Sequence, residues 1–165
     1  MFENIKPLTT AHLPEYADVI RRSFATAAKD YGLTIENCPI HWSFITDEAL
    51  AEKFQDGYYP FGLFVDNKII GFVSLAYIDD GIYEMNALSV LPEYRHNGYG
   101  KLLLDFCKNK MRELGGDLLK ISLADTDIIL KKWYVANGFI QTGVKKFESL
   151  PLPVGYMEWN SEINE

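Results

Sequence analysis

Cysteine and histidine are scarce in this sequence of 165 residues, which has two cysteines and three histidines. Cys38 and Cys107 are far apart, with no CxxC pair and no histidine at ligand spacing, which argues against a zinc site and against a disulfide scaffold. The histidines are scattered as well, so no pair of ligands gathers on one helical face. We therefore expect no bound metal, and thiols that are buried or idle.

Long hydrophobic runs are also missing. The longest nearly apolar stretch, Ile69 to Ile78, contains a glycine and a serine and has ten residues, whereas a transmembrane helix needs about 18 or more. The first residues do not show a basic segment followed by an apolar one, which is the pattern of a secretory signal. The sequence thus predicts a cytoplasmic chain that does not partner a membrane.

Basic residues are outnumbered, with 16 Lys and Arg against 23 Asp and Glu and a formal net charge of −7. A nucleic-acid-binding protein needs a basic face to neutralise phosphates, so this balance argues against a nucleic-acid partner. The 48% hydrophobic and 24% charged residues are typical of a globular protein. We expect residues 1–165 to form a single domain.

Hydrophobic periodicity and turn residues predict an alternating series of strands and helices. The expected strands are 2–8, 61–65, 68–78, 82–90, 118–123, 139–146 and 154–159. The expected helices are one that Thr9 or Thr10 caps and that ends before Tyr31-Gly32, a short one after Thr46, 98–114, and one that Asp125 or Thr126 caps and Asn137-Gly138 ends. This order predicts an α/β (α+β) fold, with a mixed, mostly antiparallel central sheet of about seven strands flanked by about four helices. An edge strand such as Val154 to Trp159 could pair two copies into a homodimer.

The residues with the clearest chemistry are Arg95-His96-Asn97-Gly98-Tyr99-Gly100-Lys101. They lie between a strand that has ended and a helix that is starting, where unpaired backbone N–H groups can hold an anion. The two glycines let the backbone approach a phosphate, and the arginine and lysine add positive charge. A Walker A loop is excluded because Leu102 follows the lysine, and the dinucleotide fingerprint is excluded because Leu103 stands where its third glycine belongs.

The longer stretch from Leu88 to Leu103 resembles the acetyl-coenzyme A binding motif of the GNAT superfamily of N-acetyltransferases, Arg/Gln-x-x-Gly-x-Gly/Ala after a V-x-P strand end. Trp133-Tyr134-Val135-Ala136-Asn137-Gly138-Phe139 is similar to that family's aromatic-Tyr-x-x-x-Gly-Phe element. The resemblance implies the GNAT fold. It also implies transfer of an acetyl group from acetyl-CoA to an amine, by direct attack through a tetrahedral intermediate.

The resemblance also implies residue roles. The amides of the loop would bind the coenzyme A diphosphate, and the strand end would bind the pantetheine through its main chain. The cofactor-binding residues implied in this way are Leu88, Ser89, Val90, Arg95, His96, Asn97, Gly98, Tyr99, Gly100 and Lys101. Tyr134 matches the family's general acid, which protonates the leaving thiolate, and Glu84 resembles its general base. Even spacing puts Glu84 on one strand face with Asn86, Leu88 and Val90 unless a bulge intervenes. Asp127 stands where the family often carries Asn, which puts a pantetheine contact there in doubt.

Two other functions fit the sequence. A non-catalytic acyl-CoA binding or sensor module would keep the loop without proton transfer, and a structural domain could carry the loop by accident. The acceptor, a small-molecule or peptide amine, also stays open among polyamines, aminoglycosides, amino acids, peptide N-termini and protein lysines. Aromatic residues gather between positions 31 and 59, in the least regular region. GNAT proteins often line the acceptor pocket there, but the sequence assigns these residues no role.

Overall fold

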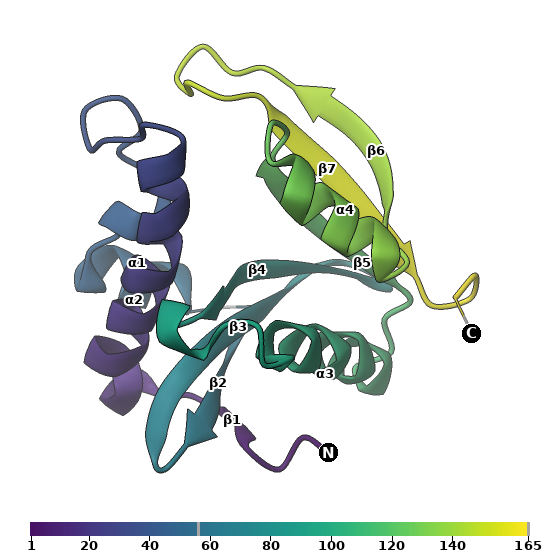
Figure 1. Ribbon diagram of the computed structural model, residues 1–165. Helices are drawn as coiled ribbons and strands as arrows, with labels where there is room; N and C mark the ends of the chain where they lie inside the picture. The colour runs from purple at the N-terminus through teal and green to yellow at the C-terminus, as the bar shows by residue number, and fades with distance from the viewer. Residues whose placement is uncertain (56, 165) are drawn as a thin grey trace.

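The computed structural model describes residues 1–55 and 57–164, and within them the chain forms one seven-stranded sheet with the strand order β1-β2-β3-β4-β5-β7-β6 (Figure 1). The strands are β1 (Ile5–Pro7), β2 (Tyr58–Val65), β3 (Lys68–Asp79), β4 (Ile82–Val90), β5 (Leu118–Ala124), β6 (Ile140–Lys145) and β7 (Val154–Asn160). The helices are α1 (Leu13–Asp30), α2 (Asp47–Lys53), α3 (Tyr99–Glu113) and α4 (Ile128–Ala136). Short 3₁₀ turns occur at η1 (Thr10–His12), η2 (Trp42–Phe44) and η3 (Pro92–Tyr94).

The sheet is mixed, as predicted. Neighbouring strands are antiparallel except for β4 and β5, which run parallel. Helices cover both faces of the sheet. Phe72 of β3 stacks on Tyr16 of α1, with the ring centroids 5.3 Å apart. The preceding residue, Gly71, faces the opposite side of the sheet, where a Cβ would meet the side chain of Leu103 of α3. Among the described residues, no helix combines the length and hydrophobicity needed to cross a bilayer.

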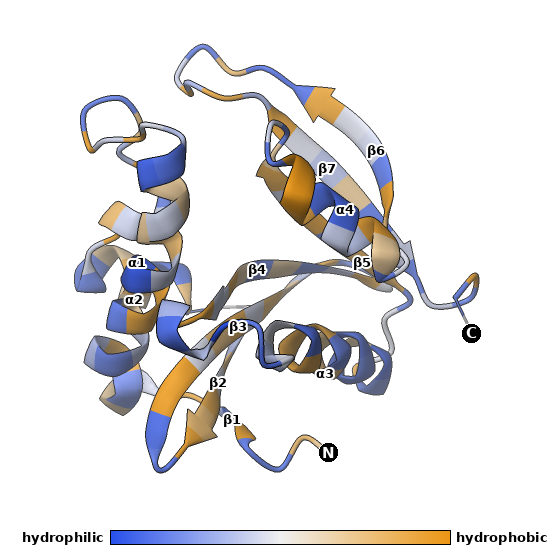
Figure 2. Cartoon of the chain, viewed as in Figure 1, coloured by the Kyte–Doolittle hydropathy of each residue, from blue (hydrophilic) through white to orange (hydrophobic). Residues whose placement is uncertain are grey.

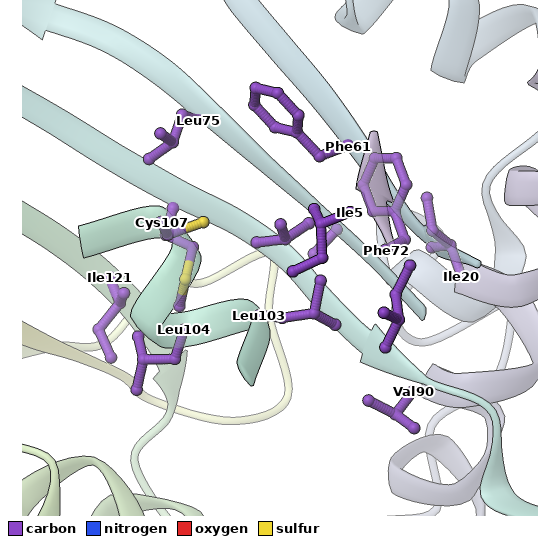
Figure 3. Close-up of a cluster of buried hydrophobic side chains, with 14 of the residues drawn as sticks. Ile5, Ile20, Phe61, Phe72, Leu75, Val90, Leu103, Leu104, Cys107 and Ile121 are labelled. Carbon is purple, nitrogen blue, oxygen red and sulfur yellow. The ribbon is translucent and has the colours of Figure 1, made fainter. Parts of the chain in front are cut away.

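The core lies between the sheet and these helices. Figure 3 shows buried side chains from β1, α1, β3 and α3, including Ile5, Ile20, Phe72 and Leu103. Ile20, Phe72 and Leu103 are completely buried. Figure 2 shows the corresponding pattern of hydropathy, with a hydrophobic stretch along β3 and alternating colours along α1. The burial of one helical stripe explains why the apolar residues of α1 recur at helical spacing.

Most predicted boundaries are confirmed within three residues. β2 begins at Tyr58 rather than at residue 61, because Tyr58 and Tyr59 pair with Ala76 and Leu75 of β3. The prediction that residue 125 or 126 caps α4 is wrong. Asp127 is the N-cap, and its side chain accepts a hydrogen bond from the backbone N–H of Leu130 at 3.0 Å. This residue therefore has a local structural role in starting the helix.

The prediction that Val154 to Trp159 forms an edge strand is also wrong. β7 pairs with β5 on one side and with β6 on the other, so its main chain is used twice. The edge on this side of the sheet is β6, which follows α4 directly but lies outside β7. The sequence cannot reveal that β7 lies between β5 and β6, because strand order depends on pairing between distant segments.

Candidate active site

The central feature of the site is the separation of β4 from β5. The two strands pair only at their beginnings, where Ile82, Tyr83 and Glu84 lie opposite Leu118, Leu119 and Lys120. Beyond this point the strands diverge, as Figure 1 shows. The β5-facing main chain of β4 from Met85 onward consequently has no partner strand and is available to another molecule.

A β-bulge in β4 changes which residues share a face. Phe72 of β3 pairs with Ser89, and Ser74 pairs with Asn86, so two residues of β3 span three of β4. Ala87 accordingly adopts a φ of 54°, and the extra residue reverses the side-chain alternation. Glu84 therefore shares its face with Ser89, whereas Val90 points to the opposite face. The shared face of Glu84 and Asn86 is thus confirmed, whereas Leu88 and Val90 leave it because the bulge that the prediction allowed for does intervene.

The loop from η3 to α3 presents a row of free backbone donors. Among the described residues, no backbone or side-chain acceptor bonds the amides of residues 96–101, and regular pairing resumes with Leu102 N–H to Gly98 C=O. His96 and Gly98 have φ angles of 63° and 82°. These left-handed conformations turn successive amides toward one side, and Gly98 adopts its conformation without a Cβ penalty. The helix dipole of α3 adds partial positive charge at the same place.

These amides face a cavity of about 740 Å³. Its walls come from β4, the loop, α1 and α4, and it contains eight of the ten predicted cofactor-binding residues: Leu88, Val90, Arg95, His96, Gly98, Tyr99, Gly100 and Lys101. A Cβ added at Gly100 would meet only Trp133, at 3.9 Å. Gly100 thus leaves open space that a larger residue would fill, and the site fits a bulky phosphate group.

The other two predicted residues contribute differently. Ser89 is 1% exposed, and its hydroxyl donates to the carbonyl of Ala87 at 2.7 Å, which braces the bulge. Asn97 donates through Nδ2 to the carbonyls of Tyr94 and Arg95, both at 3.0 Å. Both side chains shape the backbone, and neither lines the cavity.

The side chain of Arg95 points into the protein rather than toward the loop amides. Its guanidinium donates to the carbonyl of Ser23 at 2.7 Å and to the hydroxyl of Thr26 at 3.2 Å, both on α1. Its Nε donates to the carbonyl of Val90 at 3.2 Å. Arg95 therefore connects α1, the end of β4 and the loop. The sequence analysis placed the charge of Arg95 beside the helix dipole, but its guanidinium is hydrogen-bonded to Ser23, Thr26 and Val90 instead. Sequence reasoning missed the partners on α1, since no local pattern connects them to residue 95.

Tyr134 is buried next to the cavity. Its ring contacts those of Trp133 and Phe139, with centroids 5.0 and 5.1 Å away, and Trp133 itself lines the cavity. Burial, and then the neighbouring Cys107, raise the pKa of Tyr134. No side-chain hydrogen bond among the described residues involves its hydroxyl. The phenol is thus held protonated at neutral pH, with its donor uncommitted.

Cys107 is completely buried, and burial raises the pKa of its thiol. A neutral, inaccessible thiol is a poor nucleophile, which agrees with the expectation that neither cysteine takes part in chemistry. Cys38 is buried as well. Within residues 1–55 and 57–164, no three acidic, histidine or cysteine side chains gather closely enough to hold a metal ion.

Glu84 does not line the large cavity. It is half-buried in the paired part of β4, between Ala76 and Lys120. Asn86 lies on the same face, nearer the bulge, and its Nδ2 is buried without a hydrogen-bond partner in the described part of the chain. An unpaired buried donor costs roughly 1–3 kcal/mol. The sequence analysis placed Asn86 on this face beside Glu84, which the strand register confirms, but it assigned Asn86 no role.

The acidic residues Asp30 and Asp127 lie in the cavity walls. The pKa of Tyr31 is raised, first by loss of hydration and second by the adjacent carboxylate of Asp127. Tyr31 ends α1 and Asp127 starts α4, so these two side chains approach each other across the cavity.

Figure 2 shows the beginning of α4 as strongly hydrophobic. Ile129, which also lines the cavity, is 85% exposed there.

Known proteins share this architecture. The ribosomal-protein-S18-alanine N-acetyltransferase of Escherichia coli superposes with a TM-score of 0.76 at 18% identity, covering 94% of this chain and 92% of its own. The PaiA N-acetyltransferase of Thermoplasma acidophilum, solved with coenzyme A, superposes with a TM-score of 0.71 at 22% identity, covering 94% and 97%. The fold is therefore that of the solved N-acetyltransferases.

The sequence comparison specifies the family. Residues 24–139 match the family model described as the acetyltransferase (GNAT) family, and the chain belongs to that family. An amino-acid acetyltransferase of Vibrio vulnificus is 33% identical over 88 residues, 53% of this chain. One from Pseudomonas putida is 30% identical over 82 residues, 50% of this chain. The matched part is 18% of the length of each of these relatives.

Proposed function

We propose that the chain is an acetyl-CoA-dependent N-acetyltransferase that transfers the acetyl group directly to an amine through a tetrahedral intermediate. The observation that carries this proposal is the run of unpartnered amides at residues 96–101, which opens onto the 740 Å³ cavity beside the separated strands. The family membership and the coenzyme A bound to the Thermoplasma acidophilum protein support it.

In this proposal the loop amides bind the diphosphate of coenzyme A. Main-chain donors suit this role because the loop and the first turn of α3 fix their positions. Binding therefore costs little conformational entropy. The unpaired main chain of Leu88, Ser89 and Val90 then binds the pantetheine as a neighbouring strand would, which brings the thioester into the opening between β4 and β5. A main-chain N–H there would polarise the thioester carbonyl, and such a donor is worth roughly 10²–10³ in rate in other enzymes.

Tyr134 would assist departure of the sulfur. Because its pKa is raised above that of an ordinary phenol, complete proton transfer to a free thiolate with a pKa of about 8.5 is uphill. The useful contribution is a hydrogen bond from the hydroxyl to the sulfur as negative charge develops. In the net reaction one proton that the attacking nitrogen loses ends on the thiol of coenzyme A, and Tyr134 keeps its own proton.

The amine must lose a proton before it attacks. An alkylamine with a pKa of about 10.4 is less than about 0.1% neutral at pH 7. Glu84 is proposed as the base, acting through water because it lies outside the large cavity. The buried Nδ2 of Asn86 on the same face could hold such a water.

The position of Glu84 also favours a second candidate function, an acyl-CoA binding or sensor module without catalysis. Such a module would use the same loop and cavity and would need no base. The two functions predict the same affinity for coenzyme A and differ only in turnover.

The test incubates the purified chain with acetyl-CoA and a panel of amines while free thiol is followed, and measures coenzyme A binding by calorimetry in parallel. Turnover with at least one amine supports the enzyme. Binding without turnover across the panel supports the sensor module. Absence of binding at millimolar coenzyme A would overturn both functions.

A further inference from the structure

A second, smaller cavity of about 180 Å³ lies at the same end of the molecule as the large one. It is formed by the segment after α1, the end of β5 and the segment before β7. Figure 1 shows the first and last of these segments at the same end of the protein. The side chains that define its character are Leu33, Cys38, Trp42, Leu150, Leu152 and Val154.

The two cavities share a wall. Phe24 lines the large cavity. Its ring lies against His41 and Trp42, which line the small one, with centroid separations of 5.8 and 6.2 Å. The strands give the same relation. Ala124, at the end of β5, lines the small cavity, and Leu88, near the end of β4, lines the large one. The small cavity therefore opens on the far side of the gap in which the proposed function places the thioester.

The lining of the small cavity contains no aspartate, glutamate, lysine or arginine. Its titratable side chains are Cys38 and His41. Burial lowers the pKa of His41, which favours the neutral ring, and Nδ1 of that ring is already bonded to the Ser43 hydroxyl at 2.7 Å. An ammonium group or a carboxylate placed in this cavity would lose its hydration without gaining a partner of opposite charge. An apolar group would lose nothing and would bury hydrophobic surface.

We propose that this cavity selects the acceptor, and that the acceptor is a primary amine attached to an uncharged apolar group about the size of one aromatic ring or a branched aliphatic chain. The inference rests on the proposed function, because it assigns the substrate class of the same reaction. The size follows from the volume, since an apolar cavity of about 150 Å³ is known to accept benzene. The amine could belong to a small molecule or to the first residue of a peptide, because both present the same chemistry.

The first test compares acceptors at fixed acetyl-CoA. The panel consists of 2-phenylethylamine, isoamylamine, a tripeptide amide beginning with Phe, a tripeptide amide beginning with Glu, and spermidine. We expect kcat/KM to be at least about tenfold higher for the apolar amines or the Phe peptide than for the Glu peptide and spermidine. Preference between the free amines and the Phe peptide identifies the source of the amine. Equal or faster turnover of spermidine or of the Glu peptide would overturn the inference while leaving the proposed function intact.

The second test alters the cavity. Leu152→Asp places a carboxylate in the apolar wall, and Leu152→Met is the volume-matched control. Leu152 lies outside the helices and strands, so neither change removes a hydrogen bond of the fold. We expect Leu152→Asp to raise KM for 2-phenylethylamine at least about tenfold with KM for acetyl-CoA unchanged, and Leu152→Met to stay within about twofold of the wild type. An unchanged KM in the Asp variant would contradict the assignment.

A binding measurement separates the two proposals. Trp42 lines the small cavity, so titration with 2-phenylethylamine should change the tryptophan fluorescence of the wild type, and Trp42→Phe should abolish that change. If this signal appears without turnover of any amine, the apolar site stands and the proposed catalysis fails. If acetyl-CoA is turned over and the signal is absent, the proposed function stands and the cavity assignment fails.

Discussion

The two cavities of this protein present opposite chemistry on the two sides of the gap between β4 and β5. The large cavity is lined at one end by main-chain donors at residues 96–101 and by the acidic side chains of Asp30 and Asp127 along its walls. The small cavity is lined almost entirely by apolar side chains. The large one can bind a charged ligand through fixed dipoles, whereas the small one can select only by size and by rejecting charge.

The two cavities also differ in how the chain builds them. The donors of the large cavity come from one short segment between β4 and α3, so their geometry is set by local turns. The small cavity combines three segments that are distant in sequence, around Leu33, Ala124 and Leu152. A chain built this way can alter the lining of the small cavity through its loops while the loop ahead of α3 stays unchanged.

The largest effect is expected at Tyr134, whose ring packs against Trp133 in the wall of the large cavity. Tyr134→Phe removes a hydroxyl that has no hydrogen-bond partner among the described residues, so the fold should be unaffected. We expect kcat to fall roughly 10²-fold or more, with the Kd of coenzyme A and the fluorescence response to 2-phenylethylamine unchanged. Thiol-release kinetics and calorimetry measure the two quantities. A Tyr134→Phe variant with full kcat would contradict a role for the phenol in the reaction.

The next effect should be confined to the large cavity. Gly100→Val fills the space in front of the amides, and its Cβ meets only Trp133 at 3.9 Å, so the protein itself is not strained. We expect coenzyme A to bind roughly 10- to 100-fold more weakly, because its phosphate oxygens lose charge-assisted hydrogen bonds. Gly143→Val in β6 is the matched control, since open space also surrounds that position. Equal binding by both variants would mean that the phosphates bind elsewhere.

A smaller effect should distinguish Arg95 from its neighbour Arg22 at the junction of α1 and the loop. Arg95→Ala leaves several carbonyl and hydroxyl partners unbonded, and we expect a loss of about 2 kcal/mol in the free energy of unfolding and roughly tenfold weaker coenzyme A binding. Arg22→Ala removes a half-exposed pair with Glu93 at 2.8 Å, which is worth less than about 0.5 kcal/mol. Denaturant unfolding and calorimetry compare the two. Similar losses in both variants would contradict a bracing role for Arg95.

The smallest effect concerns stability in alkali. Burial raises the pKa of Tyr134 above 10.0 and that of Cys107 above 9.0 in the folded state. The stabilisation from keeping each group neutral is complete below its unfolded pKa and is lost as pH rises toward its folded pKa. Each group should lower the free energy of unfolding by about 1.4 kcal/mol per pH unit above its unfolded pKa. Denaturant unfolding from pH 8 to 11 measures this, and Tyr134→Phe should flatten the decline above pH 10. An identical slope in that variant would indicate that Tyr134 ionises freely in the folded protein.

Several features were predictable because their causes are local. The turn at Asp66-Asn67, the left-handed Gly98 and the left-handed Gly138 follow from residue types that tolerate positive φ. The helical spacing of apolar residues likewise predicted where α1 and α3 form. The candidate loop could be found for the same reason, since its donors and glycines are consecutive.

Other features depend on contacts between distant residues. The bulge at Ala87, the interior position of β7 and the inward turn of Arg95 toward Ser23 leave no mark in any short window of sequence. The unpaired Asn86 Nδ2 is visible only when its surroundings are known.

The amino-acid order alone thus determined that the chain forms a mixed sheet with a glycine-containing loop ahead of α3, because backbone preferences and hydrophobic periodicity act over a few residues. Only the tertiary structure decided where β4 and β5 part, which side chains line each cavity, and that the smaller cavity lacks charge. Those properties arise from packing among segments that are distant in sequence, whose mutual positions are set by the folded sheet as a whole.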